Sequence, residues 1–200
     1  HIGQHIAAAL PDGHALVNPF GPLYAPQVIA HHLRLLLDTA PLPDATYFEG
    51  VEGMWHNRWF STHVSSVELA TCRRLTTDAL SAARDLLRRA DVLVLTLGTD
   101  RCYRLPDGRL VANCHKQPAA FTEHAADVET LTSDLRRALD SLRALRPELQ
   151  VVWTVSPYRY AKYGLHASQL AKARLLLAVD ALCATDERSV YFPAYELLLD

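Results

Sequence analysis

The sequence predicts an α/β protein in which a mostly parallel β-sheet lies between layers of helices. Two segments, Asp91 to Thr96 and Gln150 to Val155, are rich in aliphatic residues, as is typical of strands buried on both faces. Between them, apolar residues recur every three or four positions from Val128 to Leu145, which predicts an amphipathic helix. Strand, helix and strand therefore alternate along the chain, as they do in proteins with parallel sheets.

The composition fits one folded domain that spans residues 1–200. This length is enough to bury a core, and 50% of the residues are hydrophobic while 21% are charged. The formal net charge of −2 gives no indication of a basic face for nucleic acid, and no apolar run approaches the roughly 20 residues that span a bilayer. The four cysteines are scattered without a CxxC pair, which argues against a zinc knuckle or a disulfide framework and favours a reducing, cytoplasmic location.

The first residues predict a helix, a strand and a rigid loop. Ile2 to Leu10 is apolar enough for a short helix, and His14 to Val17 for a short strand. The loop from Asn18 to Pro22 holds two prolines around Gly21, so its backbone is stiff and accessible. The Gly21 amide could donate to an oxyanion, or the loop could be a plain tight turn. The sequence supports both interpretations equally.

The next predicted helix begins at Pro26, which suits a first helical position, and Pro41 prevents its continuation. His31 and His32 lie within this helix, and we expect them at its surface or at the boundary of the core. The segment from Tyr47 to Thr62 has no regular pattern and is unusually aromatic. We interpret it as the wall of a pocket rather than as a cap over the core, because several large aromatic side chains in one loop must be buried against a partner.

A long helix is predicted to follow, with Ser65 and Glu68 as its capping box and an end near Ala90. The first buried strand comes next, and it leads into a Gly98-Thr99 turn. Chemistry in an open parallel sheet takes place beyond the carboxyl ends of the strands, so we expect this turn to contribute to a site.

A β-hairpin is predicted from Tyr103 to Val111, because Pro106-Asp107-Gly108 forms a reversal between two short strand-like segments. The hairpin would place the polar segment from Asn113 to Lys116 beside the Gly98 turn. We therefore expect the two polar segments to build parts of the same site.

Polar loops follow three of the predicted strands. These loops run from Asn18 to Gly21, from Gly98 to Thr99 and from Ser156 to Arg159. Because the carboxyl ends of parallel strands meet at one edge of a sheet, we expect the three loops to lie close together. A helix from Ser168 to Cys183 and a last strand from Ser189 to Phe192 complete the predicted fold.

No nucleophile or metal site is evident within the chain. Ser156 lacks the G-x-S-x-G elbow of a nucleophilic serine, so a structural role in the turn is favoured. Cys114 and His115 are adjacent on an extended segment and point to opposite sides, so we expect a packed thiol and an imidazole that faces the pocket. A metal site made from His56, His63 and His115 is the least supported alternative, because no two of them have ligand spacing on one regular element.

Three polar side chains are suited to binding a substrate anion. Asn113 can donate two hydrogen bonds, as a side chain of an oxyanion hole must. Lys116 and Arg159 could bind an anionic group, or they could be ordinary surface cations. Neither a Walker sequence nor a G-x-G-x-x-G motif is present, so we expect no nucleotide, and we expect no other cofactor and no metal.

Five segments, in this order and spacing, resemble the GSCFA-domain family: NPFGPLYAP, LTLGTDRCY, NCHKQP, VSPYRY and YFPAYE. The resemblance runs from Asn18 to the last residue. The family is placed in the SGNH (GDSL-like) hydrolase superfamily. The resemblance implies a three-layer α/β/α sandwich of flavodoxin-like topology, with a mostly parallel sheet and the β-hairpin as an excursion, and it implies serine-hydrolase chemistry.

The superfamily pattern implies roles for some of these residues. In the superfamily a serine after the first strand is the nucleophile, a glycine after the second strand and an asparagine after the third help to form the oxyanion hole, and a C-terminal Asp-x-x-His supplies the base. Gly21 falls where the glycine is expected. Gly98 begins the third-strand block, but Thr99-Asp100 stands where the asparagine is usual, so we expect Asn113 to replace it. Tyr160 occupies a position where relatives commonly have histidine, which weakens any catalytic role there.

The motif that names the family, Gly-Ser-Cys-Phe-Ala, is not in the sequence. His1-Ile2-Gly3 resembles the residues that immediately follow it, so the resemblance implies a nucleophile a few residues upstream. It implies an Asp/His block beyond Asp200. We therefore expect one GSCFA-like domain, residues 1–200, that is truncated at both ends and inactive by itself.

Together these observations predict a serine esterase or acyltransferase that acts on a carbohydrate or lipid O-acyl group. Gly21 and Asn113 would donate to the oxyanion. The other candidate substrate-binding residues are Asn18, Trp55, His56, Gly98, Thr99, His115, Lys116 and Arg159. The alternative is a non-catalytic carbohydrate- or acyl-binding module on the same fold, and the oligomeric state is left open.

Overall fold

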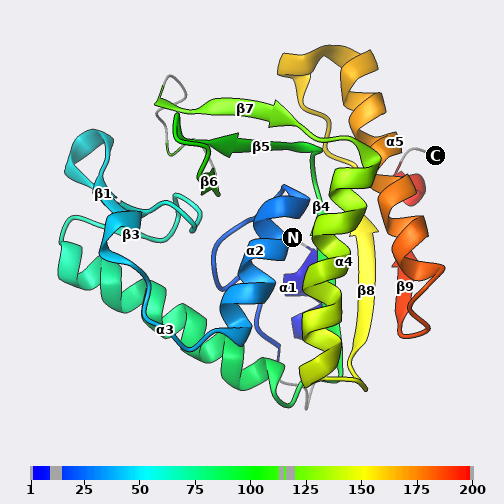
Figure 1. Cartoon of the computed structure of the whole chain (residues 1–200), viewed down its shortest axis with the longest axis horizontal. Coiled ribbons are helices and arrows are strands. Elements are labelled where there is room, and N and C mark those ends of the chain that lie inside the picture. The colour runs from blue at the N-terminus through cyan, green and yellow to red at the C-terminus, as the bar shows by residue number, and fades with distance from the viewer. Residues whose placement is uncertain (1, 10–14, 113–114, 116–119, 199–200) are drawn as a thin grey trace.

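The computed structural model describes residues 2–9, 15–112, 115 and 120–198, and it confirms the α/β class (Figure 1). Its centre is a parallel sheet of β4 (Val92–Leu97), β8 (Gln150–Val155) and β9 (Ser189–Phe192), in the order β4-β8-β9. The strands pair in step, so that Leu95 lies opposite Trp153 and Trp153 opposite Tyr191. All three carboxyl ends therefore lie at one edge of the sheet.

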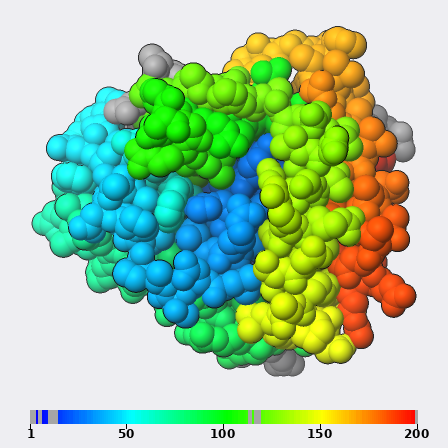
Figure 2. All heavy atoms as spheres, in the orientation of Figure 1, coloured from blue at the N-terminus to red at the C-terminus, as the bar shows by residue number. Residues whose placement is uncertain are grey.

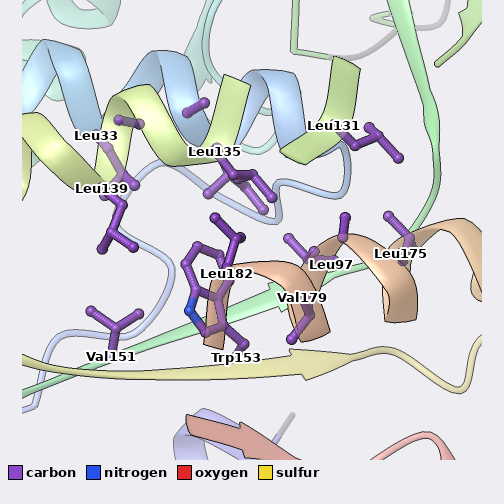
Figure 3. Close-up of a cluster of buried hydrophobic side chains, with 14 of the residues drawn as sticks. Leu33, Leu97, Leu131, Leu135, Leu139, Val151, Trp153, Leu175, Val179 and Leu182 are labelled. Carbon is purple, nitrogen blue, oxygen red and sulfur yellow. The ribbon is translucent and has the colours of Figure 1, made fainter. Parts of the chain in front are cut away.

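Helices cover one face of this sheet. They are α2 (Pro26–Leu37), α4 (Val128–Leu145) and α5 (Gly164–Cys183), and α4 packs against both of the others. The chain runs from β4 through α4 to β8, and then from β8 through α5 to β9. Because both crossovers are right-handed and move in the same direction across the sheet, both helices lie on the same face. Figure 3 shows the core between this layer and the strands, to which Leu135 of α4, Trp153 of β8 and Leu182 of α5 contribute.

The other face of the central sheet is partly exposed. Every second residue of β4 is exposed, and Val190 on β9, at the other edge of the sheet, is 50% exposed. The prediction that the first aliphatic strand is buried on both faces was therefore wrong for the described part of the chain, because the helices that follow it pack on one side only. The remaining long helices are α1 (Ile2–Ala9) and α3 (Leu69–Leu87).

Two small antiparallel sheets lie outside the central sheet. One is formed by β1 (Tyr47–Glu49), β2 (Trp55–Asn57) and β3 (Ser65–Ser66), and it packs against α3. The other, in the order β6-β5-β7, is formed by β5 (Arg101–Arg104), β6 (Leu110–Val111) and β7 (Thr122–Ala125). Short 3-10 turns complete the chain: Asp44–Thr46, Val51–Gly53, Ala161–Tyr163 and Glu196–Leu198.

Most predicted elements are confirmed, and two are wrong for physical reasons. The hairpin of β5 and β6 turns at residues 106–108 as predicted. Residues 15–17 form no strand, because no neighbouring strand pairs with them in the described part of the chain. Ser65 does not cap a helix, because it belongs to β3 and pairs with His56, and α3 begins only after Glu68. None of the described helices has both the length and the apolar character that crossing a bilayer requires.

Candidate functional site

The carboxyl ends of β4 and β8 bring two of the three predicted loops together. The Ser156 amide donates to the carbonyl oxygen of Leu97 at 2.8 Å, so the loop after β8 begins beside the loop after β4. The hydroxyl of Ser156 accepts a hydrogen bond from the Tyr158 amide at 3.2 Å. Ser156 therefore has the structural role in the turn that its sequence context predicted.

The third loop reaches the same edge through Tyr24. The carbonyl oxygen of Tyr24 accepts hydrogen bonds from the amides of Gly98, at 2.8 Å, and of Thr99, at 3.3 Å. A Cβ atom on Gly98 would lie 3.1 Å from the Cβ atom of Tyr24, so a larger residue would push the two segments apart. Tyr24 is thereby held against the end of β4, whereas Gly21, three residues earlier, packs against Ser61.

The turn of residues 18–21 is a tight one. The Gly21 amide donates to the carbonyl oxygen of Asn18 at 2.9 Å, and both residues have positive φ angles, 72° for Gly21 and 47° for Asn18. A Cβ atom on Gly21 would lie 2.4 Å from the Cβ atom of Ser61, so only glycine fits. In this arrangement the amide is used by the turn, and its role at an oxyanion stays a prediction.

A network of buried charged side chains holds the Gly98 loop in place. Lys172 on α5 is 1% exposed, and its Nζ atom donates to the carbonyl oxygen of Gly98 at 2.6 Å. Asp100 is equally buried, and Arg174 donates to its Oδ2 atom at 2.6 Å. Burial lowers the pKa of Lys172 to about 8, although the negative charge of Asp100 opposes this shift.

Sequence reasoning missed this network, although one signal was available. Lys172 occupies the buried stripe of α5, three residues before Leu175 and seven before Val179. A lysine on an apolar stripe needs a buried partner, and here the partner is the Gly98 carbonyl.

His115 belongs to a different cluster, built on the β1–β2–β3 sheet. Its ring lies 5.3 Å from the ring of His56 and 5.2 Å from that of Phe48, measured between centroids. The Arg58 guanidinium stacks over Phe48 at 4.3 Å. Burial, and then the neighbouring His56, lower the pKa of His115 to about 4. This imidazole is therefore neutral near pH 7.

The predicted site residues thus fall into two groups. In Figure 1 the β1–β2–β3 sheet, which carries Trp55 and His56, lies to the left of α2, whereas β4 and β8 lie to its right. Gly98 and Thr99 belong to the second group, together with Arg159, which is exposed on the loop after β8. Asn113 and Lys116 lie outside the described residues.

His31 lies at the boundary of the core as predicted, whereas His32 is more buried than the sequence predicted. His32 packs between Phe20 and Phe60, with ring centroids 4.8 and 5.7 Å away, and its Nδ1 atom donates to the Val28 carbonyl oxygen. His31 contacts the ring of Trp59. The expectation of a position at the surface or at the boundary of the core was wrong for His32, because the aromatic segment folds back over α2 and covers it.

The aromatic segment is mainly a cover for α2 and α3. Phe60 is fully buried with Phe20, Leu80 and Ala83 in a second small core.

A small cavity lies away from the aromatic segment. It is at the surface of α2, between the β6–β5–β7 sheet and α4, which Figure 2 shows. The cavity has a volume of about 180 Å³ and is lined by Gln27, Cys102, Arg104, His124, Ala125, Ala126, Asp127 and Thr130.

Comparison with known proteins decides the family. The model of the GSCFA family matches residues 1–200, the whole chain. The chain belongs to the GSCFA family. No curated protein and no solved structure matches this GSCFA chain. In the described part of the chain, no group of three or more His, Cys, Asp or Glu side chains is arranged to hold a metal ion.

Substituting Lys172 tests the support of the Gly98 loop in this GSCFA chain. Lys172→Met removes the donor to the buried Gly98 carbonyl, so we expect the free energy of unfolding to fall by about 1–3 kcal/mol. Urea denaturation measures the change. As the control, Arg74→Met removes an exposed ion pair with Asp78 and should change the value by about 0.5 kcal/mol at most. Equal stability of Lys172→Met and the parent chain would contradict the assigned role.

Stability should fall as the pH is lowered below about 6.5. Burial lowers the pKa of His32 to about 3 and that of His31 to about 4, and His115 also has a pKa of about 4. Below pH 6.5 the unfolded chain takes up protons at these imidazoles and the folded chain does not. Each group then lowers the free energy of unfolding by up to about 1.4 kcal/mol per pH unit, and the full contribution is present only above pH 6.5.

Urea denaturation from pH 7 to pH 5 checks this, with His32→Phe as the diagnostic variant. Phenylalanine keeps an aromatic ring between Phe20 and Phe60 but takes up no proton, so we expect a shallower pH dependence. His166→Gln, at an exposed position on α5, should keep the slope of the parent chain. A parent chain that is equally stable at pH 7 and pH 5 would contradict the prediction.

Proposed function

We propose that this GSCFA chain is part of an SGNH-type serine hydrolase that cleaves an ester, either a carbohydrate or a lipid O-acyl group. The observation that carries the proposal is the pair of hydrogen bonds from Gly98 and Thr99 to the Tyr24 carbonyl. It joins the segment that follows Gly21, the residue expected to be the superfamily glycine, to the loop that begins the third-strand block. Two segments expected to serve one active site are thus neighbours at the carboxyl edge of a parallel sheet.

The proposed fold is the three-layer α/β/α sandwich of this superfamily. One helix layer is formed by α2, α4 and α5. The opposite face of the sheet carries exposed aliphatic side chains, among them Val94 and Val190, and this face would pack against the second layer.

In the proposed reaction a serine attacks the ester carbonyl, and the negative charge that develops on its oxygen is held by donors from this chain. Asn113 would supply two N–H groups, and Gly21 its amide. The Gly21 amide would have to exchange the Asn18 carbonyl for the oxyanion, which is the stronger acceptor because it carries a charge. The serine belongs to the Gly-Ser-Cys-Phe-Ala motif, which is not among the 200 residues.

Two related functions are the alternatives, and one observation supports the first. The amides of Gly21, Gly98 and Thr99 each donate to a main-chain carbonyl, so in this arrangement none of them is available to an oxyanion. A carbohydrate- or acyl-binding module would keep this arrangement. An O-acyltransferase would use the same site as the hydrolase and pass the acyl group to a hydroxyl group instead of water.

The test is hydrolysis of p-nitrophenyl acetate by the protein that carries the family motif. Replacing the motif serine by alanine should abolish turnover. Asn113→Ala should lower kcat about 100- to 1,000-fold, the loss typical of one oxyanion donor. The control is Ser141→Ala on the exposed face of α4, which should keep the parent rate. Equal rates with and without the motif serine would reject the hydrolase.

A further inference from the structure

Five of the eight tyrosines gather around the carboxyl edge of β4 and β8, although they come from three separate segments. We call this group the tyrosine platform, and it consists of Tyr24, Tyr103, Tyr158, Tyr160 and Tyr163. The ring of Tyr160 lies at its centre, 5.1 Å from that of Tyr158 and 5.9 Å from that of Tyr163, between centroids. Tyr24 adjoins Gly98, so the platform reaches the proposed active site.

The phenol groups of the platform are close enough to affect one another. Burial, followed by the neighbouring phenols of Tyr24, Tyr163, Tyr158 and Tyr103, raises the pKa of Tyr160 above its usual range. The Tyr160 hydroxyl group is therefore protonated near neutral pH and can both donate and accept hydrogen bonds.

Charged side chains hold the base of the platform. The Lys162 ammonium donates to Glu123 at 2.9 Å and to the Tyr103 hydroxyl at 3.1 Å. The Arg101 guanidinium stacks over the ring of Tyr163 at 4.3 Å and lies 3.8 Å from Glu123. These contacts fix the inner rings of the platform.

The outer rings are open to solvent. Tyr158 is 65% exposed and Tyr24 is 45% exposed. The ring of Tyr158 stands at 82° to that of Tyr160, and each exposed ring offers a flat apolar face with a hydroxyl group at its edge. An acyl chain needs an enclosed apolar pocket to lose most of its contact with water, whereas a sugar ring has an apolar C–H face and a polar rim that match such a surface.

We infer that Tyr24 and Tyr158 bind a neutral pyranose ring of the substrate. The inference rests on the proposed function and deepens it, because it selects a carbohydrate ester over a lipid ester. A sugar stacked on the platform would place its acyl group toward Gly98. The sequence provided one signal, the three closely spaced tyrosines at positions 158, 160 and 163.

The test is a chemical-shift titration of the full chain with tri-N-acetylchitotriose and with cellotriose. At least one of them should bind, and Tyr158→Ala should weaken that binding about tenfold, the scale of one lost aromatic partner. Tyr158→Phe keeps the ring and should bind within about threefold of the parent chain. The control is Phe192→Ala, which removes an exposed aromatic ring on β9 outside the platform and should leave the affinity unchanged.

Two results would overturn the inference. One is the absence of binding by either sugar in a folded parent chain. The other is equal affinity of Tyr158→Ala and the parent chain. Neither result depends on enzyme turnover, so the hydrolysis of p-nitrophenyl acetate is a separate test of the proposed function. A short-chain phosphatidylcholine below its micelle concentration provides the comparison ligand, and its binding at Tyr158 in place of both sugars would likewise overturn the choice of a carbohydrate.

Discussion

The carbonyl oxygen of Tyr24 accepts two hydrogen bonds from consecutive amides, those of Gly98 and Thr99, and much of the structure depends on this contact. It requires a glycine at position 98, because a Cβ atom there would press against Tyr24. Since α2 begins at Pro26, two residues later, the contact also fixes where α2 starts above the sheet. The helix then packs along α4 and continues the layer that buries the core. One loop contact thus connects the helix layer to the edge where chemistry is proposed.

The surroundings of that contact are rigid rather than adaptable. Lys172 satisfies the Gly98 carbonyl, and Arg174 pairs with the buried Asp100 carboxylate. Burying these charges is costly, and each is tolerated only because it has a partner. Such a support holds a loop in a fixed position, which is what a site needs if its donors are to be preorganised. On the outside, the exposed ring of Tyr158 offers a surface that a ligand can use without moving this support.

Local patterns in the sequence predicted local structure well. The leucine periodicity predicted α4 and the aliphatic run predicted β8, each with the same first and last residues as in the structure. Contacts between distant segments could not be read in this way. The exposed outer face of β4 depends on which side the helices pack, and the burial of His32 depends on an aromatic segment about thirty residues later. Gly21 and Gly98 could be chosen as site candidates from the sequence, because Gly21 lies between two prolines and Gly98 follows a predicted strand. The Lys172 and tyrosine contacts arise only when the strands assemble.

The central claim is that the Gly98 loop is held against Tyr24 as firmly as the strands are held to one another. Amide hydrogen exchange measured by NMR tests it directly, because exchange reports whether an N–H group stays bonded in the native state. We expect the amides of Gly98 and Thr99 to exchange as slowly as that of Ser156, which donates to the Leu97 carbonyl oxygen at the edge of the sheet. Rapid exchange of Gly98 and Thr99, at the rate of an unprotected loop while Ser156 stays protected, would contradict it.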